Sequence, residues 1–204
     1  MSSRTRAVAS RAGVARRQEI LDRAAELFSR TGYRATSLIH LANAIGIAKA
    51  TLFHHFAAKE EILYELYRQA MSKALERMRA VDSAAADPAD TVRLMVQEHA
   101  LVILQNRELF TIFFDEEAGL EPAHLATIKA QQREYVEMVA AQVDRLGHAG
   151  RLRRGAHPKV VAQAILGSAS WTYRWFDPAR ELEVDEIADT LADLAVHGLL
   201  LAAS

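Results

Sequence analysis

The chain has 204 residues, which is long enough for a small domain joined to a larger one with its own hydrophobic core. Half of the residues are hydrophobic, none is cysteine, and no apolar run reaches the ~18 residues that a membrane span requires. This composition excludes disulfides, thiolate metal sites and a cysteine nucleophile, and it predicts a cytoplasmic protein with no membrane partner.

The net charge of −1 is distributed unevenly along the chain. Residues 1–60 carry ten Lys and Arg against four Asp and Glu, a balance of +6, and the remaining residues carry a balance of −7. A basic N-terminal part next to an acidic remainder indicates a polyanionic partner for the first part, such as nucleic acid. A solvated basic segment without a partner is the alternative at this stage.

The chain begins with a basic segment and a long helical pattern. Residues 1–15 are rich in Arg, Ser and Ala and have no apolar face, so they predict a flexible arm that contains arginines. Hydrophobic residues then recur at helical spacing over residues 16–31, and Gly32 follows as a helix stop.

Two short helices separated by a tight turn come next. Thr36 or Ser37 can cap the first, which ends at Gly46, and the second is expected over residues 49–56. Ala42 suits a close crossing of the two helices, and Gly46 suits a turn with positive φ. This arrangement predicts a helix-turn-helix, in which the second helix enters the major groove of DNA. An accidental Ala-x-x-x-Gly is the alternative.

The rest of the chain predicts further helices and no β-strand of useful length. The helices are expected over about 59–80, 88–105, 122–146, 157–176 and 184–202, with a short aromatic segment near 109–114. The expected fold is therefore all-α with about nine helices. A flexible arm (1–15) precedes a three-helix helix-turn-helix head (16–60), and a larger helical body (61–204) follows; the family resemblance described next implies that this body is the ligand-binding and dimerisation domain.

The segment Gly46–Leu63, with the sequence GIAKATLFHHFAAKEEIL, resembles the signature of the tetracycline repressor (TetR) family. The resemblance begins at Arg16 and stays in register to Leu63; beyond that it is a similarity of length and helix order. It implies a ligand-responsive, DNA-binding transcriptional regulator, usually a repressor that a small hydrophobic effector releases from a palindromic operator. It implies no enzyme activity and no cofactor.

The resemblance also implies which residues meet DNA. Lys49 would reach a guanine edge, Thr51 a base or phosphate, and Lys59 a phosphate at the start of the next helix. Ala48 and Phe53 stand where the family often has Ser or Thr and Tyr, so a helix cap and a hydroxyl contact are missing. The expected DNA-binding residues are Thr36, Ser37, Lys49, Ala50, Thr51, Phe53, His54, His55 and Lys59.

Two of these residues allow a different interpretation. His54 and His55 could suggest a metal site, but neighbours on a helix point about 100° apart and no nearby carboxylate or thiol completes a ligand set. We therefore expect no metal. Lys49 on any other helix would be an ordinary solvated lysine.

For the body, the resemblance implies a homodimer formed by the last two helices and a pocket for a small molecule. Small residues at 162–170 and the apolar face of 187–199 suit close helix pairing; packing within one subunit is the alternative. Aromatic, sulfur-bearing and polar side chains are candidates for the pocket, although each could equally belong to an ordinary core. They are Met95, His99, Val102, Phe110, Phe113, Phe114, Tyr135, Met138, Trp171 and Arg174.

The segment Trp171–Pro178, with the sequence WTYRWFDP, resembles the end of the eighth helix in actinobacterial family members that sense lipid or sterol breakdown products as CoA thioesters. An acyl-CoA or another hydrophobic metabolite is then the expected effector, with Arg151, Arg153 and Arg154 available for its polar end. An enzyme would need a nucleophile with a base, paired carboxylates or a metal cluster, and none is evident. A helical protein–protein adaptor, or a non-catalytic small-molecule binder without specific DNA recognition, is the alternative, but neither explains the basic head.

Overall fold

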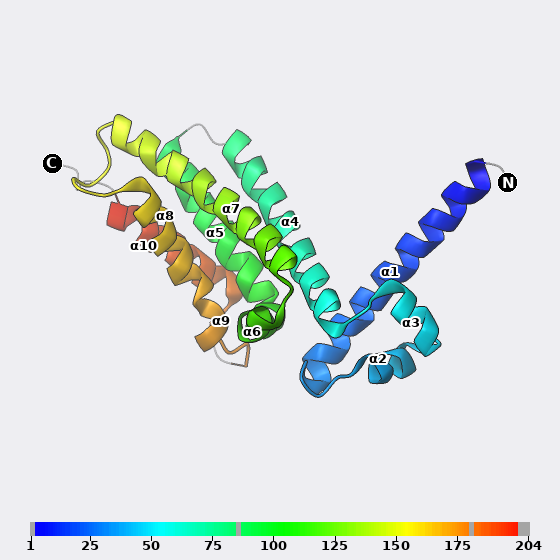
Figure 1. The fold of residues 1–204 in the computed structure, drawn as a ribbon. Coiled ribbons are helices and arrows are strands. Elements are labelled where there is room, and N and C mark those ends of the chain that lie inside the picture. The colour runs from blue at the N-terminus through cyan, green and yellow to red at the C-terminus, as the bar shows by residue number, and fades with distance from the viewer. Residues whose placement is uncertain (1–2, 85–86, 180–181, 200–204) are drawn as a thin grey trace. The chain divides into compact units, whose positions relative to one another are not determined.

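The computed structural model describes residues 3–84, 87–179 and 182–199. Within these ranges the chain forms helices α1–α10 and one 3-10 turn, η1, without a β-strand (Figure 1). This confirms the all-α prediction. The shortest of these helices, α9, is a single turn of four residues. No helix of the described ranges is both long and apolar enough to span a membrane.

The chain divides into two compact units. The first, called the head unit below, comprises Met1–Arg68 and Ile112–Leu120; the second, the body unit, comprises Gln69–Thr111 and Glu121–Ser204. The chain passes from one unit to the other inside α4 (Lys59–Ala84) and inside α6 (Arg107–Glu116). The head unit therefore extends past residue 60, where the sequence placed its end, and it also includes a segment from the middle of the chain.

The head unit begins with α1 (Ser3–Thr31), which is longer than the sequence pattern indicated. Residues 3–15, for which we predicted a flexible arm, continue this helix. Alanine and arginine have high intrinsic helix propensity, so a helix does not need an apolar face in order to extend through such a segment. The side chains of the arm arginines (Arg4, Arg6 and Arg11) lie outside the described residues.

The core of the head unit forms where the hydrophobic period directs side chains inward. α1 packs against α2 (Leu38–Ile45), and α2 packs against α3 (Lys49–His55). Ala42 is buried in α2, as the expected helix crossing requires. The start of α4 closes this core. Its fully buried side chains are Ile20, Leu21, Ala24, Phe28, Leu41, Leu52, Phe56, Ile62 and Leu63.

Local signals set both ends of α2. Gly46 adopts φ 77° and ψ 31°, the left-handed conformation that only glycine enters without steric cost, so the expected turn is confirmed. At the other end Ser37 is the N-cap, and its hydroxyl accepts a hydrogen bond from the backbone N–H of His40 at 3.1 Å. Thr36, the other candidate cap, is only 1% exposed, and its hydroxyl donates instead to the carbonyl oxygen of Gly32 at 2.8 Å.

The body unit is a bundle in which α5 is the central helix (Figure 1). α5 (Pro88–Gln105) packs against α7 (Pro122–His148), α8 (Pro158–Ser170), α9 (Thr172–Trp175) and α10 (Val184–Leu199). The 3-10 turn η1 (Glu117–Gly119), between α6 and α7 in the sequence, belongs to the head unit instead. Asp87 caps α5 by accepting from the backbone N–H groups of Ala89 and Asp90, and Pro88 occupies the first turn as expected.

The helix predicted over residues 157–176 is interrupted in the structure, so the prediction of one continuous helix is wrong. The pattern predicted a single helix over 157–176, but α8 ends at Ser170 and α9 starts at Thr172. The buried hydroxyl of Thr172 donates to the carbonyl oxygen of Ala169 at 2.7 Å, and a side chain that bonds to the backbone in this way competes with the regular helix ladder. The final helix ends at Leu199 within the described residues, and positions 200–202 of the predicted helix lie outside them.

Candidate functional site

α3 presents two different faces. Leu52 is fully buried, as is Phe56 directly after the helix, whereas Lys49, Ala50, Phe53 and His54 are exposed, and Thr51 and His55 are half-buried. The ammonium group of Lys49 lies 5.4 Å from the centre of the Phe53 ring, one helical turn away, so the two exposed side chains contact each other. Six of the predicted DNA-binding residues therefore share one short helix, and most of them face solvent.

A half-buried arginine holds the end of α3 in place through one aromatic and two ionic contacts. The guanidinium group of Arg17 lies 4.4 Å from the centre of the Phe56 ring. The same guanidinium pairs with the carboxylates of Glu61 and Glu65 at 3.6 and 3.4 Å. Sequence reasoning missed Arg17 as an organising residue, because its three partners lie far away along the chain and no local pattern joins them.

The start of α3 lacks a side-chain cap. The N-cap residue is Ala48, and no side chain accepts from the first backbone N–H groups of the helix. This agrees with the missing cap expected from the sequence. The N–H of Thr51 already donates to the carbonyl oxygen of Ala48 at 2.9 Å, so the N–H groups of Lys49 and Ala50 are the ones that can meet a phosphate oxygen.

Lys59 is held by the head unit itself. Its ammonium group donates to the carbonyl oxygen of Tyr33 at 2.7 Å and lies 4.1 Å from the centre of the Tyr33 ring. Glu60 and Glu61 follow in the first turn of α4. Lys59 therefore links α4 to the end of α1, and the acidic first turn reduces the attraction of this helix start for a phosphate.

The two adjacent histidines remain separate groups. Their ring centres are 5.4 Å apart with an angle of 72° between the planes. Burial lowers the pKa of His55, and the neighbouring His54, Arg17 and Arg16 lower it further. Within the described ranges no three His, Cys, Asp or Glu side chains form a group that could hold a metal ion.

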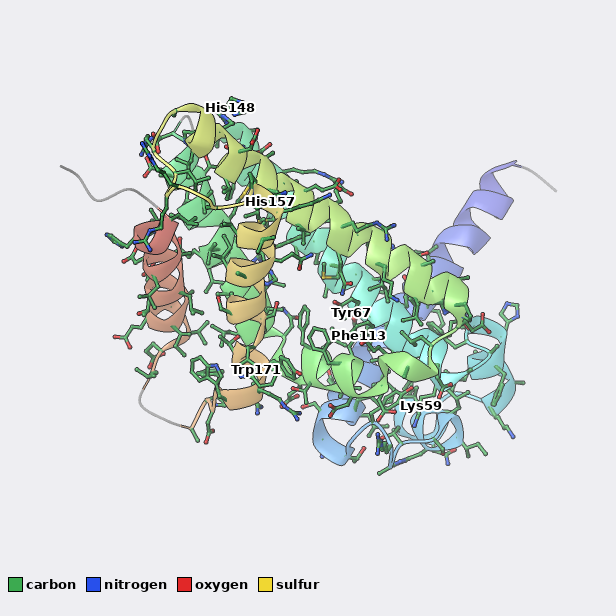
Figure 2. The ribbon with its side chains drawn as sticks, turned by 60° about the vertical axis from the view of Figure 1, so that its left-hand side comes forward. Lys59, Tyr67, Phe113, His148, His157 and Trp171 are labelled. Carbon is green, nitrogen blue, oxygen red and sulfur yellow. The ribbon has the colours of Figure 1, made fainter. Side chains whose placement is uncertain are left out.

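The candidate effector residues fall into both compact units. Phe113 and Phe114 belong to the head unit, because residues 112–120 do. The Phe113 ring stacks on Tyr67 with a centre-to-centre distance of 3.5 Å (Figure 2). In the same segment Glu116 pairs with Arg34 at 2.5 Å. Phe113 is thus a core residue beside α4 in the structure.

The other eight candidates belong to the body unit, where two of them form a polar contact inside the bundle. The rings of His99 on α5 and Tyr135 on α7 are 5.1 Å apart, and both residues are buried. The Nε2 atom of His99 hydrogen-bonds to the hydroxyl of Ser170 at 2.8 Å. Burial lowers the pKa of His99 to about 4, so its imidazole is neutral at neutral pH.

The remaining body candidates differ in exposure. Met95, Val102 and Phe110 are buried and Met138 is half-buried. Trp171, at the junction of α8 and α9, is 57% exposed (Figure 2). Arg174, in α9, is exposed as well. The structure therefore does not bring Trp171 and Arg174 into the buried contact between His99 and Tyr135.

α8 carries an exposed stripe of small and apolar residues on the side opposite to its packed face. Ala162 and Ala169, expected at a dimer contact, are instead buried within the subunit, as are Ile187 and Leu199 of α10. The exposed stripe recurs at helical spacing and consists of Val160, Gln163, Ala164, Gly167, Ser168 and Trp171. On α10, Leu194 is 66% exposed.

Two family models match this chain. The model described as "Bacterial regulatory proteins, tetR family" matches residues 20–66, and that described as "Tetracyclin repressor-like, C-terminal domain" matches residues 85–199. The second match alone covers more than half of the chain. The chain belongs to the tetracycline repressor family. The membership confirms the resemblance found in the sequence, and the chain is accordingly a DNA-binding transcriptional regulator rather than an enzyme.

Similar proteins agree with the family membership over nearly the whole chain. The transcriptional repressor KstR2 of Rhodococcus jostii is 26% identical over 185 residues, which cover 90% of this chain and 91% of the repressor. A TetR/AcrR regulator from Thermobifida fusca is 32% identical with a TM-score of 0.78, covering 90% of this chain and 98% of that structure. AibR, solved with isovaleryl coenzyme A and operator DNA, is 29% identical with a TM-score of 0.75, covering 88% of this chain and 97% of AibR.

Proposed function

We propose that this TetR-family chain is a cytoplasmic, homodimeric repressor that binds a palindromic operator and is released from it by a small hydrophobic effector. The observation that carries this proposal is the two-faced α3. Its buried Leu52 fixes the helix on the head unit, while Lys49, Ala50 and Phe53 point to solvent next to an uncapped helix start. This is the arrangement that a helix entering the major groove requires.

The exposed residues of α3 suit both kinds of DNA contact. Lys49 can donate to the O6 and N7 atoms of a guanine, and Thr51 can bond to a base edge or a phosphate. Ser37, the exposed N-cap of α2, together with the first N–H groups of that helix, suits a phosphate of the backbone. His54 and His55 lie at the end of α3, where a backbone phosphate is the expected partner. For Lys59 to hold a phosphate, its ammonium group must share the contact with Tyr33 or leave it.

We place the dimer contact on the exposed stripe of α8 and on Leu194 of α10. Small side chains such as Ala164 and Gly167 allow two helices to approach closely, and a two-fold axis through this face would pair the same helices of both subunits. A dimer can present two copies of α3 to successive major grooves, about 34 Å apart.

We propose that the effector is an acyl-CoA or a related hydrophobic metabolite and that it binds in the body unit. AibR, with its isovaleryl coenzyme A, supports this class of ligand. Arg153 and Arg154 are exposed in the loop before α8 and could meet the phosphates of a CoA group. Arg151 is already paired with Asp87 at 2.5 Å, so it serves the start of α5.

Release from DNA requires that the effector prefer the conformation that does not fit the operator. α4 is one continuous helix that belongs to the head unit up to Arg68 and to the body unit beyond it. A displacement of its body part by the effector would therefore move the head, and it would change the spacing of the two recognition helices of a dimer.

Operator binding is the direct test. Fluorescence anisotropy would compare the wild type, Lys49→Ala and Lys129→Ala on the DNA upstream of the protein's own gene, at two salt concentrations. Lys129 is an exposed lysine of α7, so Lys129→Ala makes the same charge change in the body unit. We expect Lys49→Ala to lose about 1–3 kcal/mol of specific binding and Lys129→Ala to match the wild type. Equal binding to operator and scrambled DNA, or equal loss in both variants, would contradict the proposal.

The dimer face is tested by matched substitutions on exposed alanines. Ala164→Arg places a charge in the stripe on α8, whereas Ala130→Arg places the same charge on the exposed surface of α7. Sedimentation velocity should show a dimer for the wild type and Ala130→Arg, and mainly monomer for Ala164→Arg. A dimer in all three proteins would place the interface elsewhere.

A further inference from the structure

Among the described residues of the body unit, three buried polar atoms have no hydrogen-bond partner; two of them lie on α7, and the third is the Nε atom of Arg107 at the start of α6. The hydroxyl of Tyr135, on a residue that is only 3% exposed, is buried and unpartnered, and so is the Oε1 atom of Gln131. The other end of the Gln131 amide is occupied, because its Nε2 atom donates to the hydroxyl of Ser72 at 3.1 Å. Gln131 and Tyr135 are one helical turn apart on α7 and so project from the same face.

Four helices contribute polar side chains to this part of the bundle. Ser72 comes from α4, His99 from α5, Gln131 and Tyr135 from α7, and Ser170 from the end of α8. His99 contacts the Tyr135 ring and bonds to Ser170 through its Nε2 atom, but it makes no hydrogen bond to the Tyr135 hydroxyl. The polar cluster lies among apolar residues of the same face of α5, such as Met95 and Val102.

Unpaired polar groups in a protein interior are uncommon, because each one loses its hydrogen bonds to water on folding. Phenylalanine at position 135 and leucine at 131 would fill similar volumes without this cost. Two such groups on one face of one helix point to a ligand that supplies the missing partners. Spaces between the helices of a bundle are places where small molecules bind.

The charges around the cluster define the chemical class of this ligand group. The His99 imidazole is neutral at neutral pH, and burial raises the pKa of Tyr135, so this hydroxyl is neutral as well. The charged groups that act on Tyr135 are Glu98, which raises its pKa, and Arg77, which lowers it, and the two pair with each other at 3.6 Å. An anionic group of a ligand would be buried there without a free cation, which is unfavourable.

We propose that Tyr135 and Gln131 together bind one neutral oxygen, a hydroxyl or a carbonyl, of an otherwise apolar effector. The Tyr135 O–H donates to that oxygen, and Gln131 accepts from it when the oxygen is a hydroxyl. The inference rests on the proposed effector site of the body unit and adds the chemistry by which that site discriminates among apolar molecules. An unsubstituted hydrocarbon segment would leave both groups unpaired and would bind less well.

Three small probes of similar shape test this without knowledge of the natural effector. Ligand-observed NMR would measure the binding of cyclohexanol, cyclohexanone and methylcyclohexane to the full-length dimer. We expect the alcohol and the ketone to bind about threefold to tenfold more tightly than the hydrocarbon, the range that one neutral hydrogen bond supplies. Equal binding of the three probes, or no binding of any, would overturn the inference.

Variants test whether Tyr135 and Gln131 bind the probe oxygen or only stabilise the fold. Tyr135→Phe should remove the preference for the oxygen-bearing probes, and Gln131→Leu should weaken the alcohol more than the ketone. Tyr33→Phe deletes a buried tyrosine hydroxyl of the head unit and should bind the probes as the wild type does. A Tyr135→Phe protein with wild-type preference would show that the hydroxyl serves only the internal structure, for example by holding a buried water. Thermal unfolding would confirm that each variant is folded.

The oxygen could come from the thioester of an acyl-CoA or from the chain or ring that the thioester carries. Decanoyl-CoA, its thioether analogue S-decyl-CoA and 5-oxodecanoyl-CoA distinguish these sources. Weaker binding of S-decyl-CoA to the wild type, but not to Tyr135→Phe, identifies the thioester oxygen. Tighter binding of 5-oxodecanoyl-CoA, lost in Tyr135→Phe, identifies an oxygen on the chain. If the operator is bound normally but no probe shows a dependence on oxygen, this inference fails and the proposed DNA-binding function stands.

Discussion

Among the described residues, the two compact units differ in where their unpartnered buried polar atoms lie: the head unit has one, the hydroxyl of Tyr33, whereas the body unit has two close together on α7 and a third, the Nε atom of Arg107, on α6. In the head unit, Thr36 is bonded to the carbonyl oxygen of Gly32, and the buried Glu65 is paired with Arg17 and Arg68. In the body unit, Tyr135 and Gln131 each keep a buried polar atom without a partner. The single unpartnered hydroxyl of the head has no second such group beside it, whereas the two groups on α7 are one helical turn apart and can bind the same ligand atom.

The outer surfaces of the units differ in a corresponding way. The head exposes Lys49, Ala50 and Phe53 on one short helix and leaves the start of that helix uncapped. The body exposes a stripe of uncharged side chains on α8, which includes Gln163, Ala164 and Gly167. A basic side chain beside an uncapped helix start suits a polyanion, and an uncharged stripe with small side chains suits a second copy of the same helix.

The largest expected effect tests whether the head unit can unfold while the body unit stays folded. Leu52→Ala removes a fully buried side chain from the head core and should cost about 2–5 kcal/mol. Hydrogen exchange should show loss of protection in α1–α3 and retained protection in α5 and α7. Ile39→Ala, at a half-exposed position of α2, is the control and should have a much smaller effect. Equal loss of protection in both units would show that they unfold as one.

The second effect tests the interior of the body through pH. His99 titrates near 4 in the folded state and near 6.5 when unfolded, so the unfolded state binds the extra proton between these values. The stability is therefore fully present above pH 6.5 and falls as the pH drops towards 4, by about 3 kcal/mol in total. Urea unfolding of wild type and His99→Gln across this range should show a shallower fall in the variant. Ser170→Ala should keep the wild-type slope, because burial is the main cause of the shift; equal slopes in all three proteins would refute this origin.

A third and smaller effect concerns the helix starts of the head. Ser37→Ala removes the cap of α2 and should cost about 1 kcal/mol, whereas Ala48→Ser can add a cap to α3 and should gain about as much. Thermal unfolding measures both changes. Ser29→Ala, an exposed position inside α1, controls for the general effect of serine in a helix and should change stability by only a few tenths of a kcal/mol. A loss of stability in Ala48→Ser would mean that the serine hydroxyl does not reach the free N–H groups.

The smallest effect sharpens the assignment of residues 112–120 to the head unit. Arg34 is largely exposed, so its pair with Glu116 should contribute little to stability and weaken further as salt rises. A double-mutant cycle with Arg34→Ala and Glu116→Gln, at low and high salt, measures this coupling. A large coupling that persists at high salt would mean that the ion pair, rather than the stacked rings of Tyr67 and Phe113, holds this segment.

The prediction from sequence was most accurate where the determining signals are local. A cap at the start of α2, the close helix crossing at Ala42 and the turn at Gly46 lie within ten residues of one another, and the structure has each of them as expected. The prediction was less accurate where periodicity was the only guide. It placed the start of α1 at residue 16, although the helix already begins at Ser3, because Ala- and Arg-rich helices need no apolar face. It also missed the break between α8 and α9 at Thr172.

The candidate site could be predicted in part for the same reason. The family signature of Gly46–Leu63 named the residues of α3, and the structure places most of them on one exposed surface. The effector residues were chosen by residue type alone. The structure divides them between two units, moves Trp171 to the surface and joins only His99 and Tyr135 in a contact.

The sequence by itself determined the all-α class, the helix-turn-helix and the family, because these depend on spacings of three to four residues and on a contiguous motif. Only the tertiary structure decided that Arg17 meets Phe56, that Lys59 bonds to Tyr33, and that Tyr135 and Gln131 are left without partners. Such contacts join residues on different helices, and they depend on how the helices pack. No pattern within one helix specifies its neighbour, so the polar interior of the body becomes visible only in three dimensions.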